Sequence, residues 1–182
     1  MKVDTLSKSF GEKKLFTSLS FEVKRGEIIA ITGESGSGKT TLFRIISGLD
    51  RDFSGKVEET GKISYDFQEP RLLPWYTALK NASVAESETG KGEKILRELG
   101  LSDSLNKKPS ELSGGMQKRV ALARSLAAQF DTLLLDEPFE GLDGAAAKNA
   151  MEVIRRYTKN GSVLLITHDI ALAGELDGNV KI

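Results

Sequence analysis

The sequence predicts an α/β protein with a mainly parallel β-sheet. Three short apolar runs predict buried strands at 27–32, 132–136 and 162–167. A segment with helical spacing of its apolar residues follows each run, at 41–48, 144–159 and 170–175. Strands that alternate with helices favour a parallel sheet, because each parallel connection has to cross from one end of the sheet to the other.

The N-terminal residues 2–24 are predicted to form antiparallel strands that pack beside the strand at 27–32. Leu19 and Phe21 alternate with polar residues, which is the period of a half-buried strand. Residues 11–14 predict the turn between two such strands. The chain is therefore expected to enter the parallel sheet from a small antiparallel one.

The middle of the chain is less regular. Polar residues and glycines predict a loop or a short hairpin at 48–62. A strand is expected at 63–67, followed by an irregular stretch in which Pro70 and Pro74 block a regular helix. Later helices are predicted at 77–84, 93–99 and 113–129, and a last edge strand at 179–182.

A glycine-rich loop lies between the strand at 27–32 and its helix. It fits G-x-x-x-x-G-K-[ST] with Gly33, Glu34, Ser35, Gly36, Ser37, Gly38, Lys39 and Thr40. Glycines let successive backbone N–H groups turn toward phosphate oxygens, and the helix that begins near Lys39 adds its positive end.

A nucleotide phosphate is expected between Gly33 and Thr41. Lys39 would reach the β- and γ-phosphates, and the Thr40 hydroxyl would hold Mg²⁺. The alternative is a glycine-rich turn that binds nothing. The motif also leaves the kind of nucleotide open.

Residues that can bind phosphate or activate water lie at the ends of the other strands of the predicted sheet. They are Gln68, the pair Asp136 and Glu137, and His168. Ligands of open α/β sheets bind at the carboxyl ends of the strands, so these side chains are expected beside the glycine-rich loop. Asp136 would hold Mg²⁺ through water, and Glu137 is a candidate general base for an attacking water.

Each of these residues also has a structural alternative. His168, the only histidine, would contact the γ-phosphate or the attacking water, but a lone histidine is often structural. Paired acids after a strand often cap a helix or lie in a solvated turn. The occurrence of Gln68, the acid pair and His168 together with the glycine-rich loop favours the functional interpretation.

A second glycine-rich helix start occurs at Ser113-Gly114-Gly115, where Ser113 is expected to cap the helix at 113–129. Glycine destabilises a helix interior by about 0.5–1 kcal/mol relative to alanine, so two glycines at the start suggest close approach of a ligand. An exposed helix N-terminus with a hydroxyl is a second potential anion site.

The composition excludes several classes of function. The 182 residues carry 26 Lys and Arg against 26 Asp and Glu, which argues against a generic nucleic-acid binder, so no nucleic acid is expected as a partner. The absence of cysteine excludes disulfides, thiolate metal sites and a cysteine nucleophile. No secretory signal is expected at the N-terminus, and no apolar run suits a membrane span.

Together these motifs resemble those of the ATP-binding-cassette (ABC) ATPases. The resemblance extends from about Phe10 to His168 and includes a Leu-Ser-Gly-Gly signature at 112–115 and the run Gly141-Leu142-Asp143, in the family's order. It implies a P-loop NTPase core with a mainly parallel sheet, an N-terminal antiparallel β subdomain and a helical subdomain inserted at about 69–112. All would belong to one ATP-binding domain of residues 1–182.

The resemblance also implies that two copies pair head to tail. Each ATP, with its Mg²⁺, would lie between the P-loop of one chain and the signature of the other, so residues 113–115 would act in trans. Asp143 would lie on the loop that crosses the interface. Gln68 would link the nucleotide and the metal to the helical subdomain, and Phe10 matches the aromatic residue that stacks on adenine.

The leading hypothesis is the ATPase subunit of a membrane transporter, most consistently an importer, since importers carry this subunit on a separate chain. It would hydrolyse ATP at the cytoplasmic face of the membrane, held there by a transmembrane permease, in a system that includes a solute-binding protein. Segments 67–75 and 136–139 are similar to importers of nitrate, sulfonates and related solutes.

A soluble ABC ATPase of cofactor assembly, or of another non-transport process, is the alternative. Members that act on chromosomes or ribosomes need long insertions or two cassettes, which this chain lacks. A GTPase or small-molecule kinase would leave the signature unexplained, and residues 106–109 lack the aspartate of a guanine-reading motif.

The sequence departs from the common family pattern in a few places. Met116 follows the signature where many members have glutamine, and residues 139–142 differ from the usual loop before Asp143. Only residues 169–182 follow His168, so the usual C-terminal helices are expected to be trimmed, which bears on how stably two isolated chains pair. Trp75 is expected to be either an exposed partner contact or a half-buried packing residue.

Overall fold

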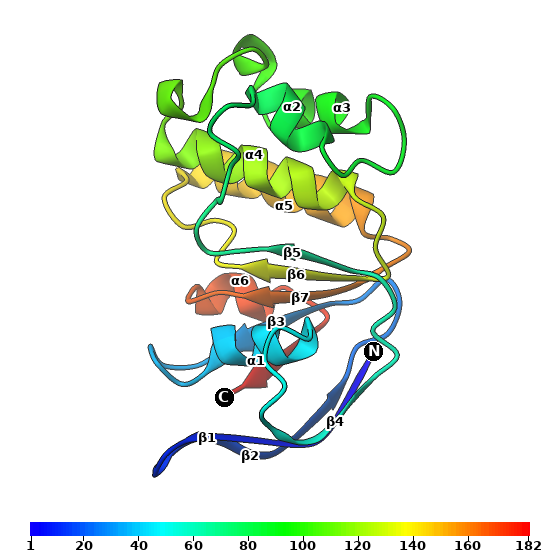
Figure 1. Cartoon of the computed structure of the whole chain (residues 1–182), viewed down its shortest axis with the longest axis vertical. Coiled ribbons are helices and arrows are strands. Elements are labelled where there is room, and N and C mark those ends of the chain that lie inside the picture. Colours follow the sequence, from blue (N-terminus) through cyan, green and yellow to red (C-terminus); the bar gives the residue numbers. More distant parts are fainter.

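The computed structural model describes residues 1–182 and contains the predicted parallel sheet (Figure 1). Its five strands lie in the order β5-β6-β7-β3-β8, and all neighbours are parallel. The strands are β5 (Ile63–Asp66), β6 (Thr132–Asp136), β7 (Ser162–Ile166), β3 (Ile28–Thr32) and β8 (Gly178–Lys181). The prediction of an α/β fold with a mainly parallel sheet is confirmed.

The strand register brings the predicted strand ends to one edge of the sheet. Asp136 of β6 lies opposite Ile166 of β7, which in turn lies opposite Ile31 of β3. Asp66 of β5 pairs with Leu135. The residues that follow these four strands therefore leave the sheet at the same edge, where parallel α/β sheets bind their ligands.

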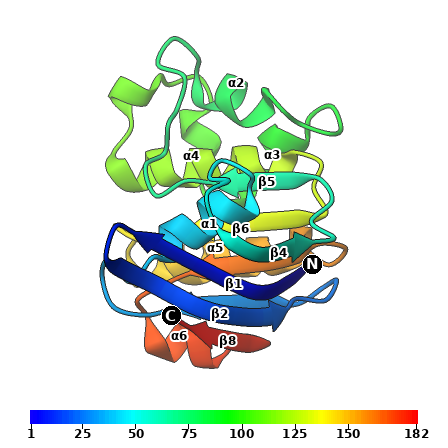
Figure 2. The ribbon, with the colours of Figure 1, turned by 60° about the horizontal axis from the view of Figure 1, so that its bottom comes forward.

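A separate antiparallel sheet has the order β2-β1-β4, with β1 (Lys2–Phe10), β2 (Lys13–Glu22) and β4 (Ser54–Glu58) (Figure 2). The antiparallel pairing predicted for residues 2–24 is confirmed. Residues 48–62 are neither a plain loop nor a hairpin, because β4 pairs with the distant β1, as in Val3 opposite Val57. The local pattern missed this strand because Val57 is its only apolar residue.

Helices cover both faces of the parallel sheet, with α4 and α5 on one face and α1 on the other (Figure 1). The α-helices are α1 (Lys39–Ile46), α2 (Ala78–Ser83), α3 (Lys91–Glu98), α4 (Gly114–Ala127), α5 (Gly144–Tyr157) and α6 (Ile170–Gly174). Two 3₁₀ turns that the sequence pattern did not predict lie at Ser102–Ser104 and Pro109–Glu111. None of the helices combines the length and the apolar character that crossing a membrane requires.

The sheet separates two hydrophobic cores. One cluster of 21 buried residues joins it to α2, α3, α4 and α5, and another of 14 joins it to α1 and the antiparallel sheet. Leu133 and Leu135 of β6 belong to the first cluster, whereas Leu134 between them belongs to the second. Burial on both faces explains why the central strands are continuous apolar runs rather than alternating ones.

Candidate nucleotide-binding site

A cleft of about 410 Å³ opens at the carboxyl edge of the parallel sheet. It is lined by Phe10, Leu15, Ser35, Gly36, Gly38, Lys39, Thr40, Thr41, Gln68, Asp136, Glu137, Ile166 and His168. Residues from the antiparallel sheet, the glycine-rich loop and the ends of three parallel strands thus meet in one place. Eleven of the predicted site residues lie here, although they are spread over most of the chain.

The glycine-rich loop needs its glycines for backbone geometry. Gly36 has φ 77° and Gly38 has φ 107°, both in the left-handed region that side chains disfavour. A Cβ on Gly33 would lie 2.3 Å from the carbonyl oxygen of Ile182, so the loop passes close to β8. The hydroxyl of Ser37 is buried without a hydrogen-bond partner, which leaves one polar atom of the loop to be satisfied by a ligand.

Lys39 stands at the start of α1 with its side chain folded over the loop. Its ammonium group donates to the carbonyl oxygens of Gly33 and Glu34, at 2.9 Å each. The side chain is buried, with 7% of the residue exposed, so the charge is largely withdrawn from water. A phosphate group bound to this loop would meet a desolvated cation, which strengthens the electrostatic attraction.

The Thr40 hydroxyl and the Asp136 carboxylate meet at the mouth of the loop. Thr40 Oγ1 donates to Asp136 Oδ2 at 3.1 Å, and the Tyr65 hydroxyl donates to the same oxygen at 3.3 Å. Burial raises the pKa of Asp136, and the hydrogen bonds from Thr40 and Tyr65 oppose that shift.

The Thr40 hydroxyl and the Asp136 carboxylate fit a magnesium ion rather than a metal that protein side chains alone would coordinate. No group of three or more His, Cys, Asp or Glu side chains able to hold a metal occurs in the structure. Mg²⁺ binds through one or two carboxylates, waters and substrate phosphates, so a single hydroxyl and a single carboxylate beside a phosphate loop are sufficient.

Glu137 and His168 form the far wall of the cleft. Glu137 has φ 53°, a left-handed backbone conformation that costs a non-glycine residue about 1 kcal/mol or more. Its Oε1 lies 3.1 Å from Nε2 of His168, yet this oxygen has no aligned hydrogen-bond donor. Burial raises the pKa of Glu137, and the nearby His168 opposes the shift. A half-buried carboxylate with a strained backbone and one oxygen without a hydrogen-bond donor, in the same cleft as the phosphate loop, has the properties of a general base.

The signature residues lie elsewhere, in a second depression of about 640 Å³. Ser113 caps α4 as predicted, since its Oγ accepts a hydrogen bond from the Met116 N–H at 3.3 Å. Gly114, Gly115 and Asp143 line the same depression, and none of them lines the cleft with Lys39.

The second depression is held together by close backbone packing. A Cβ on Gly115 would lie 3.0 Å from the Gly141 carbonyl oxygen, so the signature abuts the loop before Asp143. Asp143 caps α5 by accepting from the Ala146 N–H at 2.8 Å. The signature and the loop before Asp143 therefore lie against one another and form one surface.

Three other predicted residues do not line the cleft. Gly33 and Glu34 border a neighbouring depression with His168, and Ser37 is partly exposed with its hydroxyl oxygen buried in the loop. Conversely, Tyr65 and Lys118 were not predicted. Lys118 Nζ donates to the Glu137 carbonyl oxygen at 3.3 Å and to Glu140 Oε2 at 2.8 Å. Its place one turn after Gly114 on the signature helix is the only local signal for this role.

Trp75 is 66% exposed, so of the two alternatives for this residue the exposed side chain is observed and the half-buried packing residue is wrong. Its ring contacts only the edge of Tyr76 among aromatic residues, with ring centroids 6.3 Å apart.

Asp66 is a buried acid that the chemistry of the cleft does not use. It is 4% exposed, and its Oδ1 has no hydrogen-bond partner. Burial raises the pKa of Asp66 to about 7, because Arg124 and Lys118 offset the desolvation only in part. The raised pKa means that the proton bound to Asp66 stabilises the native state, and that this stabilisation is lost as the pH rises through 7.

The Asp66→Asn variant is therefore expected to be more stable than the parent at pH 8, by about 1–3 kcal/mol, and to differ much less at pH 5. Asparagine removes the buried charge but still buries an amide, which limits the gain. Urea unfolding at the two pH values measures the difference. Asp103→Asn, at an exposed position, is the matched control and should show no such pH dependence. An equal stability difference at both pH values would contradict the explanation.

Comparison with known proteins agrees with this geometry. The sequence profile of the family described as ABC transporter matches residues 16–140. The aliphatic sulfonates import ATP-binding protein SsuB of Corynebacterium glutamicum is 40% identical in an alignment 185 residues long, gaps included. The alignment covers 96% of this chain and 76% of that protein. The aliphatic sulfonates import ATP-binding protein SsuB 2 of Mesorhizobium japonicum is 39% identical in an alignment 189 residues long, gaps included. That alignment covers 100% of this chain and 76% of the relative.

Solved structures agree as well. The dimeric post-hydrolysis state of the ATP-binding cassette MJ0796, bound to ADP and Pi, superposes with a TM-score of 0.84 at 28% identity and covers 100% of this chain and 93% of that one. A structure of the ATP-binding subunit of an ABC transporter gives a TM-score of 0.86 at 26% identity, with coverage of 100% and 85%.

The fold and the cleft define a P-loop ATP-binding protein. The chain belongs to the ABC transporter family. Within that family it is an ATP-binding and ATP-hydrolysing subunit of the importer type.

Proposed function

We propose that this subunit drives the uptake of sulfonates or similar organic anions by closing head to tail on a second copy each time it binds ATP. The observation that carries the proposal is the separation of two half-sites on one chain. Lys39 and Glu137 line one depression, whereas Ser113 and Asp143 line another. Each half-site is then completed by the other half-site of a partner chain, and closure of the pair is the mechanical output. The solute class rests on the names of the sulfonate-import relatives.

The P-loop half-site binds the nucleotide. Backbone N–H groups of residues 33–41 and the Lys39 ammonium hold the phosphates, and the exposed ring of Phe10 at the mouth of the cleft stacks on adenine. Thr40, Asp136 and Gln68 would hold Mg²⁺, which when bound would withdraw charge from the phosphates.

Hydrolysis needs one water placed in line with the γ-phosphate. Glu137 takes a proton from this water while the water oxygen attacks the γ-phosphorus. The bond between the γ-phosphorus and the oxygen that leaves with ADP breaks. His168 and Gln68 line the same cleft as Glu137 and would orient the water and the γ-phosphate. In the second chain, the N-terminus of α4 with Ser113, Gly114 and Gly115 contributes N–H groups and a hydroxyl to the same phosphate.

We place the pair on the cytoplasmic face of the membrane, against a transmembrane permease. A solute-binding protein on the opposite side completes the system. Residues 1–182 form a single ATP-binding domain in this assembly, and the helices between about 69 and 112 are the part that faces the permease. The exposed Trp75 lies in that segment, which supports this orientation.

Complementation between inactive variants tests the trans arrangement. Lys39→Ala destroys the P-loop half, and Ser113→Arg blocks the signature half, so each variant alone is expected to be nearly inactive. A mixed pair contains one site in which both halves are intact. Mixing equal amounts should therefore restore ATPase activity toward roughly a quarter of that of the parent, by random pairing. Phosphate release after mixing measures the recovery.

Mixing Lys39→Ala with Glu137→Gln is the matched control. Both changes damage the same half-site, so no mixed pair has an intact site and no activity should return. Recovery in both mixtures, or in neither, would contradict a site shared between two chains.

A further inference from the structure

Tyr65 holds the carboxylate that faces the phosphate loop, and no sequence motif accounts for it. Its hydroxyl donates to Asp136 Oδ2 at 3.3 Å, on the oxygen that also accepts from Thr40 at 3.1 Å. The two donors come from different elements, β5 and α1. Together they fix the orientation of a buried carboxylate, since Asp136 is only 2% exposed.

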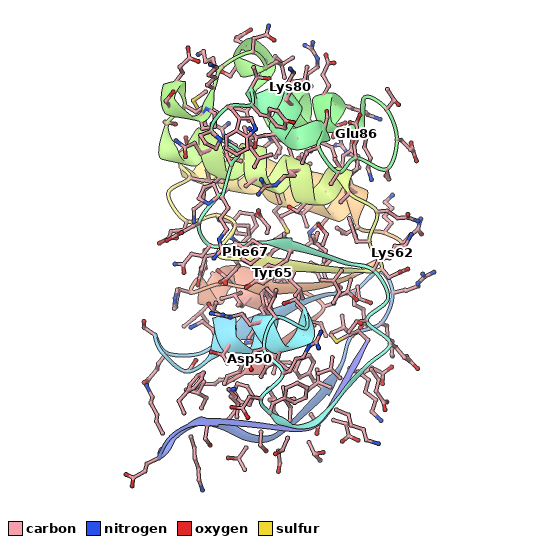
Figure 3. The ribbon with its side chains drawn as sticks, in the orientation of Figure 1. Asp50, Lys62, Tyr65, Phe67, Lys80 and Glu86 are labelled. Carbon is pink, nitrogen blue, oxygen red and sulfur yellow. The ribbon has the colours of Figure 1, made fainter.

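The Tyr65 ring is held between the phosphate-loop helix and the segment that carries Gln68. Its edge contacts the Phe43 ring of α1, with centroids 5.8 Å apart at 81°. Its face stacks on Phe67, with centroids 4.0 Å apart at 23°. Figure 3 shows Tyr65 and Phe67 next to one another at the end of β5. A change in the position of Phe67 would therefore shift the ring of Tyr65.

The stack continues into residues 68–71. The guanidinium of Arg71 lies 4.1 Å from the centroid of the Phe67 ring. Arg71 has φ 44°, a left-handed conformation that requires support from its surroundings. Arg124 of α4 supplies it by donating to the carbonyl oxygens of Pro70 at 2.9 Å and Arg71 at 3.0 Å.

We propose that Tyr65 is a positioning residue that couples the conformation of residues 68–71 to the orientation of the Asp136 carboxylate. The proposal rests on the proposed function, in which Asp136 holds Mg²⁺ and the segment after Gln68 adjoins the permease-facing helices. Movement of residues 68–71 is transmitted by the Arg71, Phe67 and Tyr65 stack to the hydroxyl that orients the metal ligand. Tyr65 itself does not contact the nucleotide cleft.

Metal affinity in the presence of nucleotide tests this role without relying on turnover. Mn²⁺ binding is measured by electron paramagnetic resonance with a non-hydrolysable ATP analogue. Tyr65→Phe keeps the ring and its stacking but removes the hydroxyl, so Mn²⁺ affinity should fall about tenfold, as for other outer-shell partners of metal ligands. The affinity for the analogue without metal should stay unchanged.

Tyr157→Phe is the matched control. The Tyr157 hydroxyl also donates to a carboxylate, Glu98 Oε1 at 3.0 Å, but far from the cleft. This variant loses the same kind of hydrogen bond and should bind Mn²⁺ as the parent does. Equal Mn²⁺ affinity of Tyr65→Phe and Tyr157→Phe would overturn the proposal.

Phe67→Leu tests the coupling to residues 68–71. It weakens the stack but leaves the Tyr65 hydroxyl in place, so a smaller loss of Mn²⁺ affinity is expected. The double variant should bind no more weakly than Tyr65→Phe alone, because both changes act through one hydroxyl. Parent-like affinity of Phe67→Leu would overturn the coupling.

A failure of the proposed function would give different results from a failure of the role of Tyr65. If the parent chain bound Mn²⁺ no better with the analogue than without it, and Asp136→Asn made no difference, the metal site itself would be wrong. If Asp136→Asn abolished Mn²⁺ binding while Tyr65→Phe left it intact, only the role of Tyr65 would be wrong.

Discussion

Replacing Glu137 with glutamine is expected to lower ATP hydrolysis by about a hundredfold or more, while ATP binding stays intact. Glutamine has nearly the same shape but cannot accept a proton from water. The carboxylate is half-buried with a pKa raised by its burial, which makes it a stronger base than an exposed glutamate. Steady-state phosphate release and equilibrium binding of ATP measure the two properties separately.

The same variant should accumulate as an ATP-bound pair of chains, because closure is no longer followed by hydrolysis. Size-exclusion chromatography with and without ATP detects this pair. Glu140→Gln is the matched control: Glu140 also follows β6 but pairs with Lys118 at 2.8 Å. Undiminished turnover of Glu137→Gln would remove Glu137 from the role of general base.

Replacing Lys39 with alanine should weaken ATP binding by about 10- to 100-fold, the loss that follows when one buried charged donor to a phosphate is removed. The Lys39 ammonium is desolvated and held by two carbonyl oxygens of the loop, so it is already placed for the phosphates. Binding of a fluorescent ATP analogue measures the affinity. The upward shift of the unfolding temperature caused by ATP should shrink in parallel.

Lys148→Ala is the control for charge alone, since Lys148 is exposed on α5 and lies outside the cleft. Both variants lose one positive charge, and only Lys39→Ala should lose affinity. An unchanged affinity of Lys39→Ala would mean that the glycine-rich loop is not the nucleotide site.

Local patterns predicted those parts of the fold that depend on local chemistry. The buried strands at β3, β6 and β7 are continuous apolar runs, and the cap Ser113 follows from residue type and position, whereas the capping of α5 by Asp143 was not predicted. Strand β4 could not be predicted, because it exists only through pairing with β1, about fifty residues earlier in the chain. Its own sequence, Ser-Gly-Lys-Val-Glu, carries almost no strand signal.

The candidate site likewise contains residues that local patterns predict and residues that only tertiary packing brings in. Motif spacing identified Lys39, Asp136 and Glu137, and strand ends in a parallel sheet must converge, so their meeting was predictable. Tyr65 was not, because its partner lies 71 residues away and the contact depends on the packing of aromatic rings from α1 and β5. Residues that orient a site through tertiary contacts leave no local pattern.

The placement of two half-sites in separate depressions of one chain has a genetic consequence. In the proposed head-to-tail pair each copy would serve two nucleotides, one with Lys39 and one with Ser113, so a damaged copy would also inactivate a site of the intact copy with which it pairs. With equal amounts of intact and damaged chains, random pairing leaves roughly a quarter of the pairs fully intact. Inactive alleles of this gene are therefore expected to be partly dominant, whereas those of an enzyme that acts as a single chain are recessive.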